Sequence, residues 1–197
     1  MTSRMPGGVA GLARRVVADD DLRAGIIAID GPSGAGKSTF ADALVAELDS
    51  RRRRSLLIRT DQFATWDEPA AWWDELERDV LAPFARSHDI AITPRVWTAG
   101  VPEVGPPVRY RWEPLLIIEG VTAARTAVAD RLDHAYWLDG PDRAERLERS
   151  VARDGEDQRP QLEAWQDFEY GWFAVDGTRE RCVVLDAPPV AERPSAE

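Results

Sequence analysis

A glycine-rich stretch near the N-terminus carries the clearest chemistry in the sequence. Residues 31–39 read Gly-Pro-Ser-Gly-Ala-Gly-Lys-Ser-Thr, which satisfies the G-x-x-x-x-G-K-[ST] pattern of a phosphate-binding loop, the P-loop. A short apolar, β-branched run precedes it and a helix-forming run, 40–48, follows it, as the motif requires. The glycines let the backbone curl so that N–H groups point inward at phosphate oxygens, and the following helix adds its positive N-terminal end. The alternative, a glycine-rich turn that matches by chance, is disfavoured by this strand and helix context.

Two side chains of this loop have separate predicted roles. Lys37 would reach the β- and γ-phosphates of a nucleotide, and the hydroxyl of Ser38 would bind Mg²⁺. Lys37 is also the only lysine in the sequence, which suggests that chemistry requires a compact ammonium at this position. The predicted nucleotide-binding residues of the loop are Gly31, Ser33, Gly34, Ala35, Gly36, Lys37, Ser38 and Thr39.

A P-loop alone occurs in kinases, switches and motor proteins, so other residues must decide between these classes. Guanine-specific switches use a motif of the type N-K-x-D. Because the single lysine already belongs to the P-loop, this sequence contains no such motif. We therefore disfavour a GTPase.

Two carboxylates follow predicted strands. Asp61 comes just after the apolar run 56–58, where it could accept the proton of an attacking hydroxyl while the γ-phosphoryl group moves in line. The alternative for Asp61 is an N-cap of the next helix. Glu119 ends the run 115–118, expected beside the strand that enters the P-loop, and could hold Mg²⁺ through water or position the substrate hydroxyl. A merely solvated strand-end acid is the alternative for Glu119, but two acids near Lys37 favour function.

Three arginines lie on one stripe of a predicted charged helix, residues 141–154. Arg146, Arg149 and Arg153 are spaced i, i+3 and i+7. A movable arginine stripe that closes over the transferring phosphate would stabilise the developing charge and exclude water. The alternative is a solvated helix laced by ion pairs such as Glu145 with Arg149.

The elements that must position these residues follow from the apolar pattern. Five runs of strand length, separated by helical segments, predict a parallel sheet covered on both faces and hence an α/β fold. These runs are 26–29, 56–58, 115–118, 135–138 and 182–185. Four of them are followed directly by an acidic residue, and ligands of such sheets bind at the carboxyl ends of the strands. Helices are predicted over 9–22, 40–48, 66–86, 141–154 and 161–175, with a loop or small hairpin over 90–112.

Composition limits the class of protein. The 197 residues suit a single domain, 1–197, with a loose tail at 1–8 and a mobile one at 190–197. The net charge of −10 argues against a nucleic-acid partner. The only basic run, 51–54, falls where the helix after the P-loop should end, so we expect it to complement the helix dipole rather than bind phosphate.

Further features bear on compartment and partners. Cys182 is the only cysteine and lies in an apolar run, so we expect a core residue and no intrachain disulfide. No apolar stretch approaches the ~20 residues that span a bilayer, and no signal-peptide pattern opens the chain. We therefore expect a cytoplasmic protein with no membrane partner. A homo-oligomer is compatible with the sequence. The two histidines, His88 and His134, lack metal-ligand spacing and are expected to be structural.

In order along the chain, these motifs resemble the uridine kinase branch of the P-loop kinases, whose relatives include phosphoribulokinase and bacterial pantothenate kinase. The resemblance covers about residues 25–186. It is carried by segments 29–39, 61–63, 118–121 and 146–154, and by Trp66-Asp67-x-Pro69-x-Ala71-Trp72, which looks like the family's substrate segment. Arg125 and Arg159 fall near arginines that the family uses close to the substrate and the lid.

The resemblance implies a P-loop NTPase fold of three α/β/α layers, with a five-stranded parallel sheet, an acceptor-binding insertion at 62–113 and an arginine-bearing lid at 141–160. It implies ATP as the donor, with the adenine near 187–189, and Asp61 as the base. The expected catalytic residues are Lys37, Asp61, Glu119, Arg149 and Arg153. The expected acceptor contacts are Asp61, Phe63, Trp66, Arg95 and Arg125, with Arg146 assigned to the nucleotide and Ser38 with Glu119 to Mg²⁺.

The sequence departs from the family pattern mainly around the acceptor. Ala64 replaces the tyrosine that usually follows Asp-x-Phe, Ser150 replaces the second of the lid's paired arginines, and the spacer from Asp61 to Trp66 is short. A His-Thr-Arg element that helps hold the nucleoside is echoed only by residues 93–95. Of the tryptophans in the insertion, we expect Trp66 to contact the acceptor first. The aromatic residues of the late helix, Trp165, Phe168 and Trp172, are expected in the core.

The resulting prediction is a kinase that moves the γ-phosphoryl group of Mg²⁺-ATP to a hydroxyl of a small metabolite, a nucleoside first. A sugar, a vitamin precursor or an antibiotic is the alternative acceptor. A non-catalytic module that uses nucleotide to order a lid for a protein partner is the alternative from another class.

Overall fold

The core of the protein is a five-stranded parallel sheet. A computed structural model of the chain describes residues 8–98 and 100–186. The strands are β1 (Gly25–Asp30), β2 (Ser55–Arg59), β7 (Leu115–Glu119), β8 (His134–Trp137) and β9 (Val183–Val184). Their order across the sheet is β2-β7-β1-β8-β9, and each neighbouring pair is parallel. The predicted five-stranded parallel sheet is confirmed, as is the position of β7 beside the P-loop strand.

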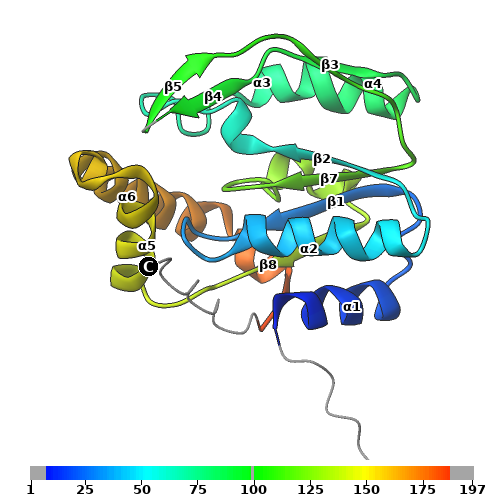
Figure 1. Cartoon of the computed structure of the whole chain (residues 1–197), viewed down its shortest axis with the longest axis horizontal. Helices are drawn as coiled ribbons and strands as arrows, with labels where there is room; N and C mark the ends of the chain where they lie inside the picture. The colour runs from blue at the N-terminus through cyan, green and yellow to red at the C-terminus, as the bar shows by residue number, and fades with distance from the viewer. Residues whose placement is uncertain (1–7, 99, 187–197) are drawn as a thin grey trace, which may run out of the picture.

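Each face of the sheet is covered, which gives three layers (Figure 1). Alternate residues of a strand point to opposite faces. Ile27 and Ile29 of β1 therefore face α1 (Val9–Asp19) and α2 (Lys37–Ser50). Ile26 and Ala28 face the opposite cluster, which contains the apolar residues of the insertion.

The insertion differs from its prediction in the first part. Residues 66–72 are not helical; the helix begins at Trp73 and runs through α3 (Trp73–Leu76), a π-helical turn η2 (Glu77–Leu81) and α4 (Ala82–Ala85). Pro69 disfavours helical backbone at the residue before it, and the indole of Trp72 donates to the Pro69 carbonyl at 2.8 Å, which holds a turn there. The apolar spacing of this segment would turn Trp73, Leu76, Val80 and Leu81 toward the core; the last three are buried, and Trp73 is half-buried.

The second part of the insertion consists of two antiparallel strand pairs, of which one lies between the two strands of the other in sequence. β3 (Ile90–Ile92) pairs with β6 (Val108–Tyr110), and β4 (Arg95–Thr98) pairs with β5 (Val101–Val104). The expected small hairpin is thus present and is extended by a second ladder.

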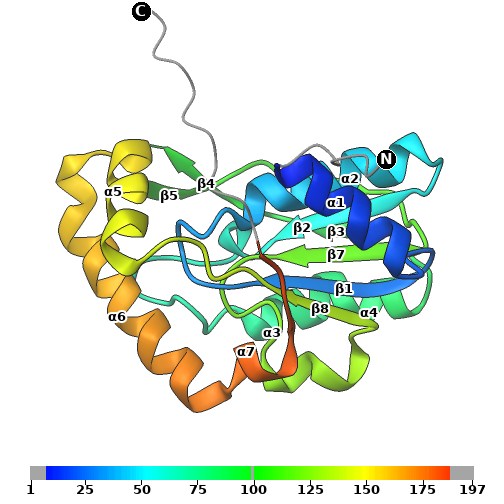
Figure 2. The same cartoon turned by 90° about the horizontal axis from the view of Figure 1, so that it is seen from below.

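Two helices stand together at the end of the sheet where β1 runs into the P-loop (Figures 1 and 2). α5 (Arg143–Asp154) begins where the side chain of Asp142 accepts the N–H of Glu145 at 2.9 Å. A 3₁₀ turn, η4 (Glu156–Gln158), leads into α6 (Arg159–Asp176). Both predicted helices are confirmed.

Short elements complete the chain. η1 (Thr60–Gln62) follows β2, η3 (Thr126–Arg131) precedes β8, and α7 (Thr178–Arg181) precedes β9. The first helix ends at Asp19 rather than Leu22, and β9 is shorter than predicted. Cys182 precedes β9 and is half-buried, not a fully enclosed core residue.

Some predictions lie outside the described residues. These are the loose tail over most of 1–8, the mobile tail at 190–197 and the adenine position near 187–189. Within residues 8–98 and 100–186, no helix combines the length and the apolar character needed to cross a bilayer.

Candidate active site

The P-loop has the backbone that its glycines predict. Gly34 (φ 76°) and Gly36 (φ 93°) adopt left-handed conformations, and Gly36 is the N-cap of α2. A Cβ on Gly31 would lie 2.2 Å from the Leu138 carbonyl oxygen, and one on Gly34 would lie 2.7 Å from the Arg146 carbonyl oxygen. The loop is therefore closely flanked on both sides, with the N-terminus of α2 at its base.

Lys37 is folded back over this loop. The residue is 7% exposed, and its Nζ donates to the Pro32 carbonyl at 2.9 Å. A buried ammonium within the turn of a P-loop is suited to phosphate oxygens, because these offer a stronger, charged acceptor than a carbonyl. The P-loop backbone and Lys37 therefore fit the phosphate groups of a nucleoside triphosphate.

The predicted metal-binding pair is assembled. The Oγ of Ser38 lies 3.3 Å from Oε1 of Glu119, whose side chain is almost fully buried. Burial raises the pKa of Glu119, and the charge of Lys37 opposes that rise. A hydroxyl beside a carboxylate offers the oxygen ligands that Mg²⁺ prefers. In the part of the chain that the structure describes, no three His, Cys, Asp or Glu side chains form a metal site by themselves, so Mg²⁺ would also need oxygens from the nucleotide or water.

Asp61 lies within the 3₁₀ turn η1, at the carboxyl end of β2. The N-cap of this turn is Arg59, so the alternative role of Asp61 as a cap is not the one observed. Its backbone carbonyl accepts the indole N–H of Trp97 at 2.8 Å, which ties η1 to the insertion. The residue is exposed, yet the protein atoms crowded around its carboxylate raise its pKa, while Arg59, Arg153 and Lys37 lower it. The charge of Asp61 also raises the pKa of Glu119, so the two carboxylates interact electrostatically.

The three arginines of α5 are in different surroundings. Arg153 is close enough for its pKa to be raised by the charges of Asp61 and Glu119, although its principal partner is Asp154, at 2.6 and 2.7 Å. Arg149 pairs with Glu145 one turn earlier on the helix. Arg153 therefore lies within electrostatic range of Asp61 and Glu119, whereas Arg149 makes the ion pair that the solvated-helix alternative predicts.

Arg146 lies directly against the P-loop. Its backbone and Cβ are the atoms that a Cβ on Gly34 would strike. One nitrogen of its guanidinium, Nη1, donates to the Pro141 carbonyl at 2.7 Å, and Nε is buried without a partner among the described residues. Arg159 is farther along the chain and is held by Glu148 and Glu156.

The predicted acceptor contacts are only partly open. Phe63 is 2% exposed and packs against Trp72, so we correct its predicted role to a core residue. Arg95 lies on β4 with its guanidinium 3.8 Å from Glu75.

Arg125 is 6% exposed and is therefore enclosed rather than presented to a ligand. It donates to the carbonyls of Ala70 and Thr122, and its guanidinium lies 4.7 to 4.9 Å from the ring centroids of Trp72, Trp73 and Trp172. Burial lowers its pKa to about 10, so it remains charged. Arg125 joins the insertion to α6 as a structural cation.

Trp66, a predicted acceptor contact, is half-buried where the insertion meets α6. Its ring meets Trp97 of the insertion at 5.1 Å and Trp165 of α6 at 5.6 Å, both edge to face. Its indole N–H donates to the Gly100 carbonyl at 2.7 Å. The row continues through Phe168 to Trp172. These three residues of α6 are half-buried and Trp165 packs against the edge of the core, so the expected core position is met only in part.

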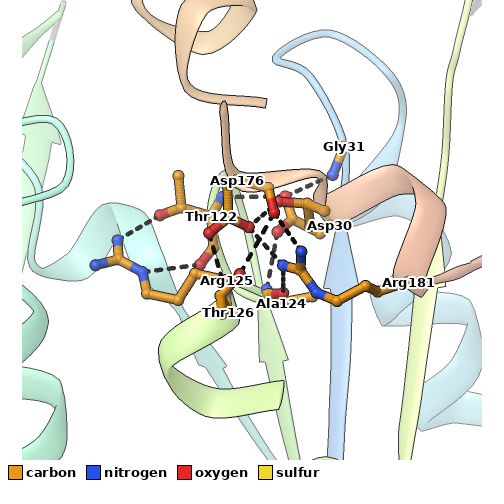
Figure 3. Close-up of polar contacts among 9 residues, drawn as sticks. Asp30, Gly31, Thr122, Ala124, Arg125, Thr126, Asp176 and Arg181 are labelled. Carbon is orange, nitrogen blue, oxygen red and sulfur yellow. Dashed lines mark hydrogen bonds and ion pairs between the residues drawn. The ribbon is translucent and has the colours of Figure 1, made fainter. Parts of the chain in front are cut away.

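Two carboxylates contribute more than the sequence indicated, and the first is Asp30. Its fully buried carboxylate accepts the N–H groups of Gly31 at 2.7 Å, Thr122 at 3.0 Å and Ala124 at 2.8 Å (Figure 3). Burial raises its pKa to about 6, although these N–H groups and Lys37 favour the charged form. Asp30 fastens the start of the P-loop to the segment that follows Glu119. The sequence marked it only as a strand-end acid.

The second is Glu169 of α6, which the sequence analysis missed. It is 2% exposed and accepts the backbone N–H of Ser33 at 3.0 and 3.1 Å, together with the Ser33 hydroxyl. The N–H of Ser33, predicted to bind nucleotide, is therefore already occupied. The available signal was its spacing from Leu162 and Gln166, which places an acid on the buried face of the helix.

Comparisons with known proteins agree with this architecture. The sequence matches no family model and no curated protein closely enough to assign a family. The structure is similar to that of a possible uridine kinase from Bacillus stearothermophilus, with a TM-score of 0.63 and 17% identity over 90% of this chain and 97% of the other. It is also similar to a candidate fructose transport system kinase from Silicibacter, with a TM-score of 0.55 and 18% identity over 95% and 100% of the two chains. At these identities the similarity shows the shared fold of P-loop kinases.

Proposed function

We propose that the protein is an ATP-dependent small-molecule kinase that transfers the γ-phosphoryl group to a hydroxyl, with a nucleoside as the first candidate acceptor. The observation that carries the proposal is the placement of the P-loop with Lys37, the Ser38–Glu119 pair and Asp61 at the carboxyl ends of three neighbouring strands. A P-loop with a second, exposed carboxylate beside it has what phosphoryl transfer to an alcohol needs: a phosphate grip and a proton acceptor.

Each residue has a definite task in this proposal. Lys37 and the inward N–H groups of the loop bind the phosphates and offset their charge. Ser38 and Glu119 would hold Mg²⁺, which supplies charge neutralisation when bound. Asp61 accepts the proton of the acceptor hydroxyl, and burial of its carboxylate raises its pKa, which makes it a better base than an ordinary aspartate. Arg153 on α5 adds positive charge where the phosphoryl group would move.

Two features support a nucleoside. One structural neighbour is described as a possible uridine kinase. The junction beside Asp61 is also lined by the indoles of Trp66, Trp97 and Trp165, which suit a flat base.

A sugar or another small alcohol is the second candidate. A structural neighbour of similar coverage is described as a candidate fructose transport system kinase. Aromatic rings also pack against the apolar faces of sugars. In addition, the sequence departs most from the uridine kinase pattern at the residues predicted to surround the acceptor.

The test is acceptor-dependent ADP release, measured by a coupled assay with panels of nucleosides, sugars and vitamin precursors. Wild type is compared with Asp61→Asn, Lys37→Ala and the control Asp74→Asn, an exposed aspartate on α3. Loss of a positioned base lowers kcat by about 10² to 10⁴-fold, so Asp61→Asn should lose turnover while its affinity for ATP persists.

Two outcomes would count against the proposal. Turnover that survives both Asp61→Asn and Lys37→Ala would contradict the proposed mechanism. Tight ATP binding with no acceptor-stimulated turnover on any panel would instead favour a non-catalytic module, in which nucleotide orders the lid for a partner.

A further inference from the structure

The end of the sheet opposite the P-loop contains an open hollow of about 660 Å³ lined mainly by arginines. Residues 51–54 come from the turn between α2 and β2, Arg23 precedes β1, and Glu113 lies just before β7. The P-loop follows the other end of β1. Six residues of strand at roughly 3.3 Å each separate the two sites by about 20 Å. The hollow is therefore distinct from the proposed active site.

Positive charge exceeds negative charge in this hollow. Three of its arginines are ion-paired: Arg51 with Glu47, Arg54 with Glu113, and Arg23 with Asp21. No ion pair is present for Arg52 or Arg53 within the described residues. Because the whole chain carries a net charge of −10, this surplus is a local reversal of the protein's charge.

Arg53 has an unmet need for a hydrogen-bond acceptor. Its Nη1 is buried and has no partner among the described residues. A buried charged donor without an acceptor is unfavourable, so this nitrogen of Arg53 is not satisfied by the described part of the protein.

Arg52 occupies a position that normally favours glycine. Its φ is 58°, and its N–H donates to the Asp49 carbonyl while the N–H of Arg53 donates to the Leu48 carbonyl. This is the helix ending in which the left-handed residue is usually glycine, because a side chain is unfavourable there. Complementing the helix dipole would not require this residue to be arginine, since its neighbours supply the same charge.

We propose that this hollow binds a small anion bearing two or more phosphate groups. Guanidinium groups match phosphate oxygens with paired, charge-assisted hydrogen bonds, and two arginines without carboxylate partners are placed to make them. The volume lies within the range of small-ligand sites. A bound anion would lie about 20 Å from the P-loop, and it would therefore not contact the nucleotide.

The test uses inorganic pyrophosphate as the probe and isothermal titration calorimetry at low ionic strength. Every protein carries Lys37→Ala, which removes the main phosphate contact of the P-loop. The test variant adds Arg52→Gly and Arg53→Gln. The matched control adds Arg86→Gln and Arg109→Gln, two exposed arginines of the insertion, and so removes the same charge elsewhere.

Arg52→Gly is chosen because it should not destabilise the fold, so that a loss of binding cannot be explained by unfolding. Glycine suits the left-handed backbone at this position, so thermal unfolding should show a fold at least as stable as the parent. Pyrophosphate binding should weaken about tenfold or more in the test variant, the loss expected for a single charge-assisted contact. Binding in the control should stay within about threefold, since long-range charge is screened.

Equal weakening in both variants would overturn the proposal, because it would show a general charge effect. Absence of any binding in the Lys37→Ala parent would also overturn it. A further arm uses vesicles containing phosphatidylglycerol, since lipid headgroups carry the same phosphate chemistry. Retention on vesicles through Arg52 and Arg53 without pyrophosphate binding would overturn the assignment to a free ligand.

Discussion

The two ends of the proposed active site are built in different ways. At the nucleotide end, groups are placed by backbone: glycine conformations, three N–H groups on Asp30 and the start of α2. At the acceptor end they are placed by aromatic side chains that contact one another across the insertion and α6. Backbone geometry follows from local sequence, whereas aromatic contacts depend on segments distant in the chain.

This difference implies different tolerances to substitution. The nucleotide end is a network of buried charges, in which removing one partner leaves others unsatisfied. The acceptor end is a set of partly exposed rings, in which a smaller ring leaves a contact weaker but no charge unpaired. Substitutions at the nucleotide end should therefore have the larger effects, and those at the acceptor end should change the KM for the acceptor without changing the KM for ATP.

The largest effect on stability is expected from Asp30. Its pKa rises from 3.8 to about 6 on folding, so the native state holds the proton more tightly than the unfolded chain. This stability is therefore fully present below about pH 3.8 and is lost as the pH rises through about 6, an amount of about 3 kcal/mol. Urea denaturation of wild type and Asp30→Asn across this range should show that difference in the unfolding free energy. The control is Asp130→Asn, an exposed aspartate of η3. Parallel pH curves for wild type and Asp30→Asn would contradict the prediction.

The next largest effect separates two arginines of the same helix. Arg153→Gln should lower kcat by about 10²-fold, because it removes positive charge beside the transferring group. Arg149→Gln should change kcat by no more than about threefold, because an exposed i,i+4 ion pair contributes little. Steady-state kinetics with the best acceptor measure both. Similar losses for the two variants would mean that α5 moves so that both arginines reach the site.

Glu169→Gln is expected to have an intermediate effect confined to the nucleotide. Loss of its charge weakens the grip on Ser33, so the KM for ATP should rise about tenfold. The values of kcat and of the acceptor KM should stay within about threefold. Glu163→Gln, an exposed glutamate on the same helix, is the control. An unchanged KM for ATP would show that the Ser33 contact does not position the loop.

The smallest effect is expected at the acceptor end. Trp66→Phe keeps a ring but removes the indole N–H that donates to Gly100, a contact of about 1 kcal/mol, so the acceptor KM should rise about threefold to fivefold. The KM for ATP should not change. Trp112→Phe removes an equivalent N–H, which donates to Phe84, away from the aromatic row. A change in the KM for ATP, or an equal change in the control, would show that the two ends are not separable.

Several features could be predicted because they depend on neighbouring residues. The P-loop, the covered parallel sheet and the limits of α5 and α6 follow from glycine spacing, apolar runs and helix ends such as Asp142. The pairing of Ser38 with Glu119 also followed, because parallel strands bring their carboxyl ends to one edge. The start of the insertion helix was missed because Trp72 and Pro69 form a turn where the apolar spacing alone favours a helix.

The amino-acid order by itself determined the phosphate end of this protein, because a P-loop is encoded within nine consecutive residues and its backbone turns are set by its own glycines. Only the tertiary structure decided which charged and aromatic side chains serve the site. It buried Phe63 and Arg125 and brought Glu169 onto Ser33. These outcomes depend on contacts between residues as many as 136 positions apart, which local sequence patterns do not specify.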